Sequence, residues 1–177
     1  NISCNGYNDG SIDISVNGAQ SYDYLWSNGE LTEDIDMLFA GNYLVIVTDT
    51  NGCSTYETIL LSEPTLLQTT IVSSNNYNGY DISCNGYSDG GIDLTVTGSV
   101  SGYTYLWDDP LVQNTATATG LSSGTYSVDI TDANGCFTSD SFFLNQPTPL
   151  ISNYTVSEIN GYGVTCHDGQ DGFIDLT

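Results

Sequence analysis

Basic side chains are missing from this sequence: it contains no Lys and no Arg, and His167 is its single histidine. Phosphate clamps, P-loops and arginine fingers need a basic side chain, and nucleic-acid binding needs many of them to neutralise phosphates. The 22 Asp and Glu residues instead give a formal net charge of −22 at pH 7. We therefore expect no nucleic acid as a partner, and we expect a protein that is not an enzyme.

Long apolar runs are also missing, since none reaches the roughly 18 residues of a membrane-spanning helix. The strong helix formers Lys and Arg are absent, whereas Thr, Val, Ile and Tyr recur in short alternating runs between 19 Gly residues. With 39% hydrophobic residues, the chain is too apolar for an acidic disordered tail. These features predict an all-β fold without a membrane span in this segment.

An internal repeat organises the chain, with an offset of about 80 residues. The copies share an Ile-Ser-Cys-Asn-Gly-Tyr segment, a Tyr-Leu-Trp segment and an Asp-x-Asn-Gly-Cys segment; these begin at Ile2, Tyr24 and Asp49, and again at Ile82, Tyr105 and Asp132. A third copy begins at Val164. We expect a longer tandem array, of which this chain is a part.

The repeat boundaries are set by Pro64 and Pro147, which occupy the same place in two copies. Because proline interrupts a strand ladder, we place the boundaries just after them. Repeat 1 is then predicted over residues 1–64, without its first strand. Repeat 2, over 65–147, is complete, and repeat 3, over 148–177, is the N-terminal part only.

Alternating apolar residues within repeat 2 predict strands near 66–73, 91–97, 103–108, 113–119, 124–131 and 136–144. This spacing is typical of an immunoglobulin-like β-sandwich. Because side chains alternate along a strand, two sets should face inward. The first is Ile92, Leu94 and Val96, matched in repeat 1 by Ile12, Ile14 and Val16, and the second is Tyr126, Val128 and Ile130.

Repeat 1 departs from the second set, because Leu44 and Ile46 replace Ser127 and Asp129 on the face expected to meet water. One interpretation is that a neighbouring loop covers the two side chains. The other is a lateral contact patch between copies of the chain, since exposed apolar strand residues mark association surfaces.

Four cysteines fall in two repeats, with Cys4 and Cys53 separated by 49 residues and Cys84 and Cys136 by 52. We predict disulfides within each repeat, Cys4–Cys53 and Cys84–Cys136, each contributing about 4 kcal/mol by closing a loop of about 50 residues. Cys166 is expected to lack a partner here. Disulfides persist in oxidising surroundings, which indicates an extracellular location. Cysteine–metal ligation is the competing interpretation, but no Cys-x-x-Cys spacing supports it.

Acidic and amide side chains flank these cysteines. If each pair were bonded, Asp9 would approach Asp49 and Asn51, and Asp89 would approach Asp132 and Asn134. Such oxygens suit calcium, the one cofactor that the sequence suggests. Alternatively, Asp-x-Asn-Gly forms a hairpin turn in which Asn and Gly supply positive φ angles, and this is the interpretation we favour.

Aromatic residues offer two kinds of role. Trp26 and Trp107 lie on the strand that carries the buried tryptophan of immunoglobulin-like sandwiches, so we expect core packing, with sugar stacking as the alternative. Tyr7 and Tyr87 lie beside Gly in polar turns and are the better candidates for surface contacts. His167 replaces Asn5 and Asn85 and is interpreted as a turn substitution.

Taken in order, these motifs resemble the SprB-type repeat of Bacteroidetes cell-surface adhesins. The motifs are Cys-Asn-Gly-x-x-Asp-Gly-x-Ile-Asp, Tyr-x-Tyr-Leu-Trp, Gly-x-Tyr, Thr-Asp-x-Asn-Gly-Cys and a closing Glu-Pro or Gln-Pro. The resemblance implies long arrays in very large surface proteins, some of them gliding-motility adhesins exported by type IX secretion. The Tyr-x-Trp strand is also similar to PKD and immunoglobulin-like domains.

We therefore expect an extracellular, cell-surface stalk or filament of disulfide-stapled β-sandwich repeats. Its partners would be neighbouring repeats and, laterally, other copies of itself. The alternative is a calcium-dependent module that binds surface polysaccharide.

Overall fold

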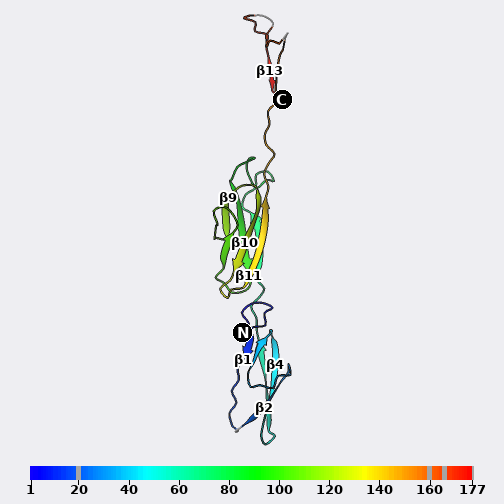
Figure 1. The fold of residues 1–177 in the computed structure, drawn as a ribbon, viewed down its shortest axis with the longest axis vertical. Coiled ribbons are helices and arrows are strands. Elements are labelled where there is room, and N and C mark those ends of the chain that lie inside the picture. The colour runs from blue at the N-terminus through cyan, green and yellow to red at the C-terminus, as the bar shows by residue number, and fades with distance from the viewer. Residues whose placement is uncertain (19–20, 159–160, 165–166, 177) are drawn as a thin grey trace.

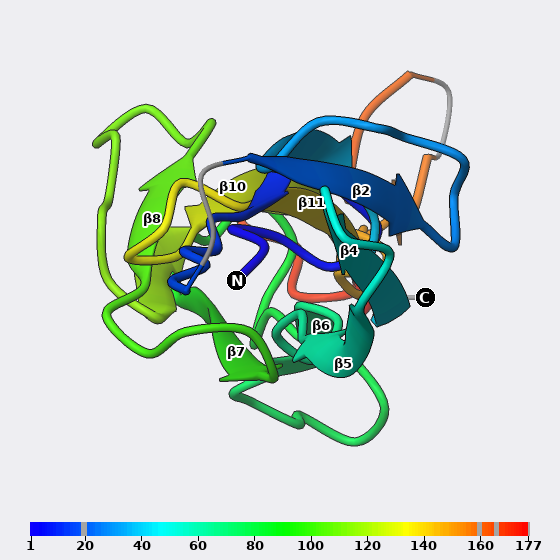
Figure 2. The same cartoon turned by 90° about the horizontal axis from the view of Figure 1, so that it is seen from below.

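The computed structural model describes residues 1–18, 21–158, 161–164 and 167–176. All named strands pair antiparallel, and the described residues contain no helix, so the predicted all-β class is confirmed. Along the long axis, repeat 1, repeat 2 and a small C-terminal sheet follow one another (Figure 1). Figure 2 looks along that axis from the repeat 1 end.

Repeat 2 is a sandwich of two three-stranded sheets. One sheet has the order β6 (Gln68–Ser73), β7 (Gly90–Thr97), β9 (Thr117–Leu121), and the other has the order β8 (Thr104–Trp107), β10 (Gly124–Thr131), β11 (Phe137–Leu144). Inward side chains of both sheets form one core, to which Ile92, Leu94, Trp107, Val128 and Ile130 belong. The inward positions predicted for these residues are confirmed.

One predicted strand of repeat 2 is misplaced: residues 113–119 were expected, whereas β9 covers Thr117–Leu121. The cause is a turn around the buried side chain of Asp109, which accepts hydrogen bonds from the backbone N–H groups of Leu111 and Gln113. The Gln113 side chain then bonds the backbone of Thr119 in both directions. Residues 109–116 are held in this loop instead of extending the sheet.

Repeat 1 has the same plan with fewer strands. Its sheets are β2 (Tyr22–Trp26), β4 (Gly41–Asp49), β5 (Ser54–Leu61) and, opposite, β1 (Gly10–Ile12) with β3 (Ile35–Leu38). The described part of residues 1–64 holds no counterpart of β6, and β1 has three residues where β7 has eight. Ile12 is buried, whereas Ile14 and Val16, where the missing strand would pack, are half-buried.

The C-terminal sheet pairs β12 (Tyr154–Val156) with β13 (Ile174–Leu176). Its register, Tyr154 opposite Leu176, repeats that of Ile71 opposite Leu94 in β6 and β7. The third copy thus begins the same sheet, although its apolar side chains remain exposed.

Gly90 shows why the Asp-Gly pair of the motif tolerates no side chain. A Cβ atom there would lie 2.5 Å from Ile82 Cδ1 and 2.9 Å from the Leu121 carbonyl oxygen. Gly10 meets the same obstruction from Leu61, Leu38 and Ile2 in repeat 1. The glycine lets the strand approach the segment that carries the first cysteine.

We expect Gly90→Ala to destabilise repeat 2 by about 2 kcal/mol, because overpacked core positions typically cost about 1–3 kcal/mol. Gly124→Ala is the matched control, since the nearest neighbour of its new Cβ atom would be a Tyr126 ring atom 3.9 Å away, an ordinary van der Waals distance. Urea unfolding followed by fluorescence measures both. Equal effects of the two substitutions would contradict the packing explanation.

Candidate functional site

The cysteines do not pair as the spacing predicted. Cys4 of repeat 1 is bonded to Cys136 of repeat 2, with their Cα atoms 5.6 Å apart, and Cys53 and Cys84 are free and exposed. The predicted Cys4–Cys53 and Cys84–Cys136 disulfides are therefore wrong. Cys166 lies outside the described residues. The disulfide joins two successive repeats, and we call the surroundings of this bond the junction.

Strand β4 explains the error. Its first residue, Gly41, pairs with Leu61 near the Cys4 end, whereas Thr48 pairs with Ser54 beside Cys53. At about 3.3 Å per residue, this nine-residue strand separates the two ends by roughly 25 Å, far beyond disulfide reach. β10 separates Cys84 from Cys136 in the same way. Each repeat thus carries one cysteine at each end.

The Cys4 end of repeat 1 is a turn tied to the residues that leave the repeat. Asn5 Nδ2 donates to the Pro64 carbonyl oxygen (3.1 Å), and the Gly6 N–H donates to Glu63 Oε2 (2.6 Å). Both the N–H and the hydroxyl of Ser3 donate to the Asp9 carboxylate. These bonds explain the motif residues around the cysteine: they fix the turn that presents Cys4 to the next repeat.

The Cys136 end of repeat 2 is organised by the buried carboxylate of Asp132. Its Oδ1 accepts the N–H groups of Asn134 (2.8 Å) and Cys136 (2.7 Å). Its Oδ2 accepts the Ser99 hydroxyl and the Val100 N–H. The predicted Asp-x-Asn-Gly turn is present, but only its glycine has a positive φ angle (+86° at Gly135), and Asn134, which was expected to share it, does not. In repeat 2 the aspartate of the turn also holds the neighbouring loop.

The linker between the repeats is packed rather than free. The Ser99 N–H donates to the Thr65 carbonyl oxygen (2.8 Å), and Leu67 is buried in the repeat 2 core. Gly98 has a φ of +82°, and a Cβ atom there would lie 1.9 Å from the Leu66 carbonyl oxygen. The linker therefore crosses directly over the Gly98 loop, which restricts bending at the junction.

Two further features cross the junction. Asn134 Nδ2 donates to the Ser3 carbonyl oxygen (3.0 Å). A cavity of about 110 Å³ lies between the repeats, lined by Tyr7 from one side and Phe137 from the other. The disulfide is thus accompanied by a hydrogen bond and by facing side chains.

Titration of Asp132 links this site to pH. Burial raises the pKa of its carboxyl, but hydrogen bonds from Ser99, Cys136, Val100 and Asn134 outweigh burial, so the pKa lies below the ordinary 3.8. A carboxyl whose pKa is lowered by folding stabilises the protein above its unfolded pKa. That contribution is lost as the pH falls below about 3.8 towards the folded value.

We expect Asp132→Asn to lower the free energy of unfolding of repeat 2 by about 2 kcal/mol at pH 7. The asparagine has an NH2 group in place of one carboxylate oxygen, and this donor would face the donors that the oxygen had accepted from. The difference from the parent chain should shrink between pH 4.5 and 2.5, read by urea unfolding at about half-unit steps. Asp49→Asn is the control: Asp49 makes the same turn with Asn51 and Cys53 but binds no second loop in the described structure. A difference that is constant with pH would contradict the assignment.

The residues predicted to bind calcium do not converge as expected. Asp9 lies at the Cys4 end of repeat 1 and Asp49 with Asn51 at the other, and Asp89 is likewise separated from Asp132 and Asn134. The predicted convergence depended on the wrong cysteine pairing. Within the described part of the chain, no group of three or more His, Cys, Asp and Glu side chains is placed to hold a metal ion.

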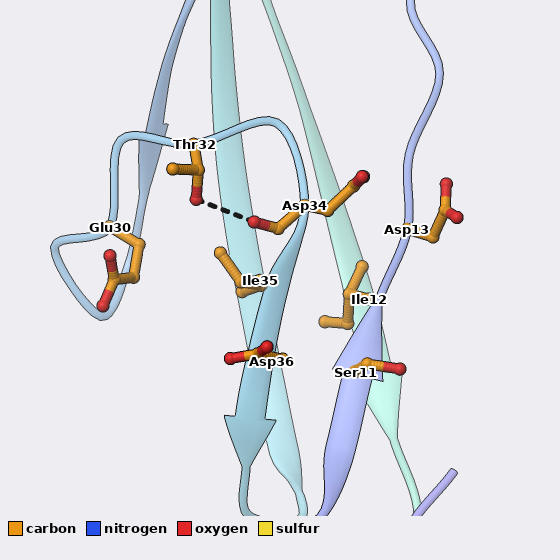
Figure 3. A pocket seen from close by; sticks show the side chains of 8 residues that line it. All are labelled: Ser11, Ile12, Asp13, Glu30, Thr32, Asp34, Ile35 and Asp36. Atoms are coloured by element: carbon orange, nitrogen blue, oxygen red, sulfur yellow. Dashed lines mark hydrogen bonds between the residues drawn. The ribbon is translucent and has the colours of Figure 1, made fainter.

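An acidic groove of about 460 Å³ lies on repeat 1, between β1 and the segment leading into β3. Figure 3 shows Asp13 and Glu30 on opposite sides of it, with Asp36 apart from both. The nearby hydroxyl of Thr32 donates to the Asp34 backbone carbonyl. The carboxylates are spread along the groove rather than gathered around one point.

The predicted surface residues lie as follows. Tyr7 and Tyr87 are exposed, Ile46 is 36% exposed and Leu44 is half-buried. The strand register adds Leu25 and Tyr56, which flank Ile46 on both sides and are themselves exposed. The alternation of side chains along residues 22–26 and 54–61 was the signal in the sequence that could have revealed this apolar row. The same row in repeat 2 is Leu106, Asp129 and Ser139, so the apolar row is specific to repeat 1.

The tryptophans belong to the core, as predicted. Trp26 and Trp107 are 2% and 1% exposed, and their indole N–H groups donate to the carbonyl oxygens of Thr32 and Thr115. His167 lies in an exposed turn beside Asp168, 3.1 Å from its carboxylate.

These features define two successive β-sandwich repeats that are joined by a disulfide. The SprB repeat matches residues 1–31 and 77–112, which are corresponding parts of repeats 1 and 2. Both segments run from the region of the first cysteine turn through the tryptophan strand. No curated protein matches the chain. Among the described residues, no helix is long and apolar enough to cross a membrane.

Proposed function

We propose that this chain is a segment of an extracellular stalk, in which end-to-end repeats hold an adhesive or enzymatic tip away from the cell. The SprB repeat is an adhesin-type structural module rather than an enzyme family, which supports a surface role without catalysis. The observation that carries the stalk role is the Cys4–Cys136 disulfide, because it joins successive repeats instead of stapling one.

Three contacts restrict bending at the junction: the disulfide, the Asn134 bond to Ser3, and the packing of the linker against Gly98. A flexible Gly/Ser linker would let repeats rotate freely, whereas a bridged junction transmits direction from one repeat to the next. Like charge on each repeat adds repulsion that favours extension and weakens with salt. Oxidising surroundings outside the cell suit such a bond. Secretion and attachment to the surface, and any role in gliding motility, belong to the same proposal.

Small-angle X-ray scattering tests this role on the oxidised chain. We expect an extended particle whose maximum dimension stays constant between low and high salt, and a broader distance distribution in Cys136→Ser. A particle that collapses in high salt with the bridge intact would contradict a bridge-stiffened stalk.

The ligand-binding alternative has its own test. We expect the chain to bind no polysaccharide on a glycan array with calcium present. Binding that a chelator abolishes would favour the polysaccharide-binding module over the stalk.

A further inference from the structure

The outer face of the β2–β4–β5 sheet in repeat 1 carries a row of apolar side chains. In the strand register, Leu25 of β2 lies beside Ile46 of β4, and Ile46 lies beside Tyr56 of β5. All three are exposed, Leu25 to 50% and Tyr56 to 74%. Leu44, two residues from Ile46 on the same face of β4, and Leu60 of β5 extend the row. We call these five residues the outer patch.

The next repeat along the chain does not cover a face of this kind. In repeat 2 the equivalent row is Leu106, Asp129 and Ser139. All three remain exposed, although repeat 1 is bonded to the adjoining end of repeat 2 at Cys136. A repeat that met the Cys53 end of repeat 1 in the same way would leave the outer patch exposed as well.

The strand that repeat 1 lacks would not cover the patch either. Its counterpart in repeat 2 is β6, which belongs to the opposite sheet of the sandwich. With β6 in place, Phe143, the counterpart of Leu60, is still 60% exposed. The exposure of the outer patch is therefore a property of the sheet face itself.

The charge of this face favours an uncharged partner surface. Asp23, in the row beside Leu25, is the one charged residue among those described on the face, and Thr48 and Ser54 complete its row. A basic partner would be attracted to the 22 acidic residues of the chain, but it would find almost no carboxylate here to pair with. A second copy brings a matching apolar face of its own.

The sizes of the side chains favour one orientation of the second copy. If two faces stack around a twofold axis that runs along β4, the strands of both copies are parallel, and β2 of each copy lies over β5 of the other. Leu25 then meets the larger Tyr56, Ile46 meets Ile46, and Asp23 meets the hydroxyl of Ser54. In the antiparallel arrangement each strand faces itself, so that Tyr56 meets Tyr56 and holds the smaller Leu25 pair apart.

We propose that the outer patch is a lateral interface between two copies of this chain, which lie side by side and point in the same direction. β4 runs along the long axis of the chain (Figure 1), so parallel strands bring like ends of the two molecules together. In repeat 2 the central Asp129 would face Asp129 of the other copy, and repulsion confines the contact to repeat 1. The contact uses one sheet face and holds whether or not the chain serves as a stalk.

The small size of the patch makes this contact weak. Three strands about 4.8 Å apart and three rows about 6.7 Å apart cover roughly 300 Å² on each copy, or roughly 600 Å² in total. Stable interfaces bury about 1,200–2,000 Å² in total. We therefore expect a dissociation constant of about 0.1–1 mM between single chains.

Sedimentation equilibrium tests the contact on the full chain with Cys53→Ser, Cys84→Ser and Cys166→Ser, so that new disulfides cannot form between chains. The Cys4–Cys136 bond is retained. We expect a monomer–dimer equilibrium that strengthens from about 50 to about 500 mM NaCl, because salt screens the like charges of the two copies. A chain that stays monomeric at about 1 mM protein in high salt would overturn the proposal and leave the patch to a different partner.

Tyr56→Asp and Ser139→Asp form a matched pair, because they place the same charge at equivalent positions of repeats 1 and 2. We expect Tyr56→Asp to weaken the dimer about a hundredfold, since each twofold interface loses two tyrosines and gains two charges. Ser139→Asp should leave the dissociation constant unchanged. Unchanged tryptophan fluorescence shows that both variants stay folded. Equal effects of the two substitutions on the dimer would overturn the assignment of the interface to the outer patch.

A spin label on Cys84 tests the direction of the two copies, because Cys84 is exposed at the end of repeat 2 away from the junction. Pulsed electron paramagnetic resonance measures the distance between labels in the dimer of the chain with Cys53→Ser and Cys166→Ser. For parallel copies we expect roughly 30–40 Å, because aligned sheets cross at about 30°. Antiparallel copies would separate the labels by roughly 100 Å, since each sandwich is about 30 Å long, and this distance would overturn the parallel interface. The scattering and glycan measurements report other properties, so failure here leaves the stalk proposal to its own test.

Discussion

Pulled by its two ends, the oxidised chain should extend roughly 470 Å less than the reduced chain. The Cys4–Cys136 bond encloses a sequence separation of 132 residues. Each residue contributes up to about 3.6 Å when fully extended. Force enters at residues 1–4, crosses the disulfide and leaves through residues 136–177, so the enclosed residues cannot lengthen even when both sandwiches unfold.

Single-molecule force spectroscopy with handles at residues 1 and 177 measures this difference as a change in contour length on reduction. The Cys53→Ser and Cys84→Ser double variant should behave as the parent chain, because neither residue belongs to the bond. Cys4→Ser should show the long extension without any reductant. An oxidised chain that extends fully would show that the bond does not span the two repeats.

Because the force passes through the Cys4–Cys136 bond, this bond has a mechanical effect that a bond within one repeat would not have. A disulfide inside repeat 1 would protect only that repeat, and the linker after Pro64 would carry all the force. The observed connection bypasses the linker and the strands of repeat 1 and most strands of repeat 2. In a chain pulled by its two ends, we therefore expect the junction rather than either sandwich to bear the load.

Local patterns made the core predictable from the sequence. Ile92, Leu94, Val128 and Ile130 alternate with polar residues, and a period of two places them on one face whatever the rest of the chain does. The burial of the two tryptophans was predictable from the strand on which they lie. The start of β9 could not be found in this way, because the turn that delays it depends on Asp109 and Gln113, whose bonds are visible only in three dimensions.

The cysteine pairing was not predictable from spacing, because spacings of 49 and 52 residues do not reveal at which end of the sandwich a cysteine lies. The direction of the strands determines at which end each cysteine lies, since β4 runs from the Cys4 end to the Cys53 end. The predicted calcium groups failed for the same reason. A repeat with one cysteine at each end favours bonds between repeats, and that possibility is visible only once strand direction is known.

The lack of basic residues has a structural counterpart. Asp9, Asp89 and Asp132 meet backbone N–H groups and serine hydroxyls instead of ammonium or guanidinium groups. For Asp9 and Asp89 the hydrogen bonds from Ser3 and Ser83 lower the pKa of the carboxyl. The acids of the motif therefore act as fixed acceptors that shape the cysteine turns, and the remaining carboxylates keep the surface charged.

Removing the bridge should also change how the two repeats unfold. In the chain-entropy model, a loop of 132 residues contributes about 5 kcal/mol, more than the roughly 4 kcal/mol of a loop within one repeat. Repeat 1 is the weaker partner, because its β1–β3 sheet has two strands where repeat 2 has three. We therefore expect Cys136→Ser to unfold in two steps, with repeat 1 unfolding first, whereas the bridged chain unfolds in steps that lie closer together and at higher denaturant.

The chain offers its own reporters for this measurement, since Trp26 lies in one core and Trp107 in the other. Trp107→Phe leaves a signal for repeat 1, and Trp26→Phe leaves one for repeat 2. Guanidinium unfolding of each single-tryptophan chain, with and without Cys136→Ser, should move the Trp26 midpoint more than the Trp107 midpoint. Cys84→Ser controls for loss of a thiol in repeat 2. Unchanged midpoints after loss of the bridge would mean that the disulfide links the two repeats without stabilising either of them against unfolding.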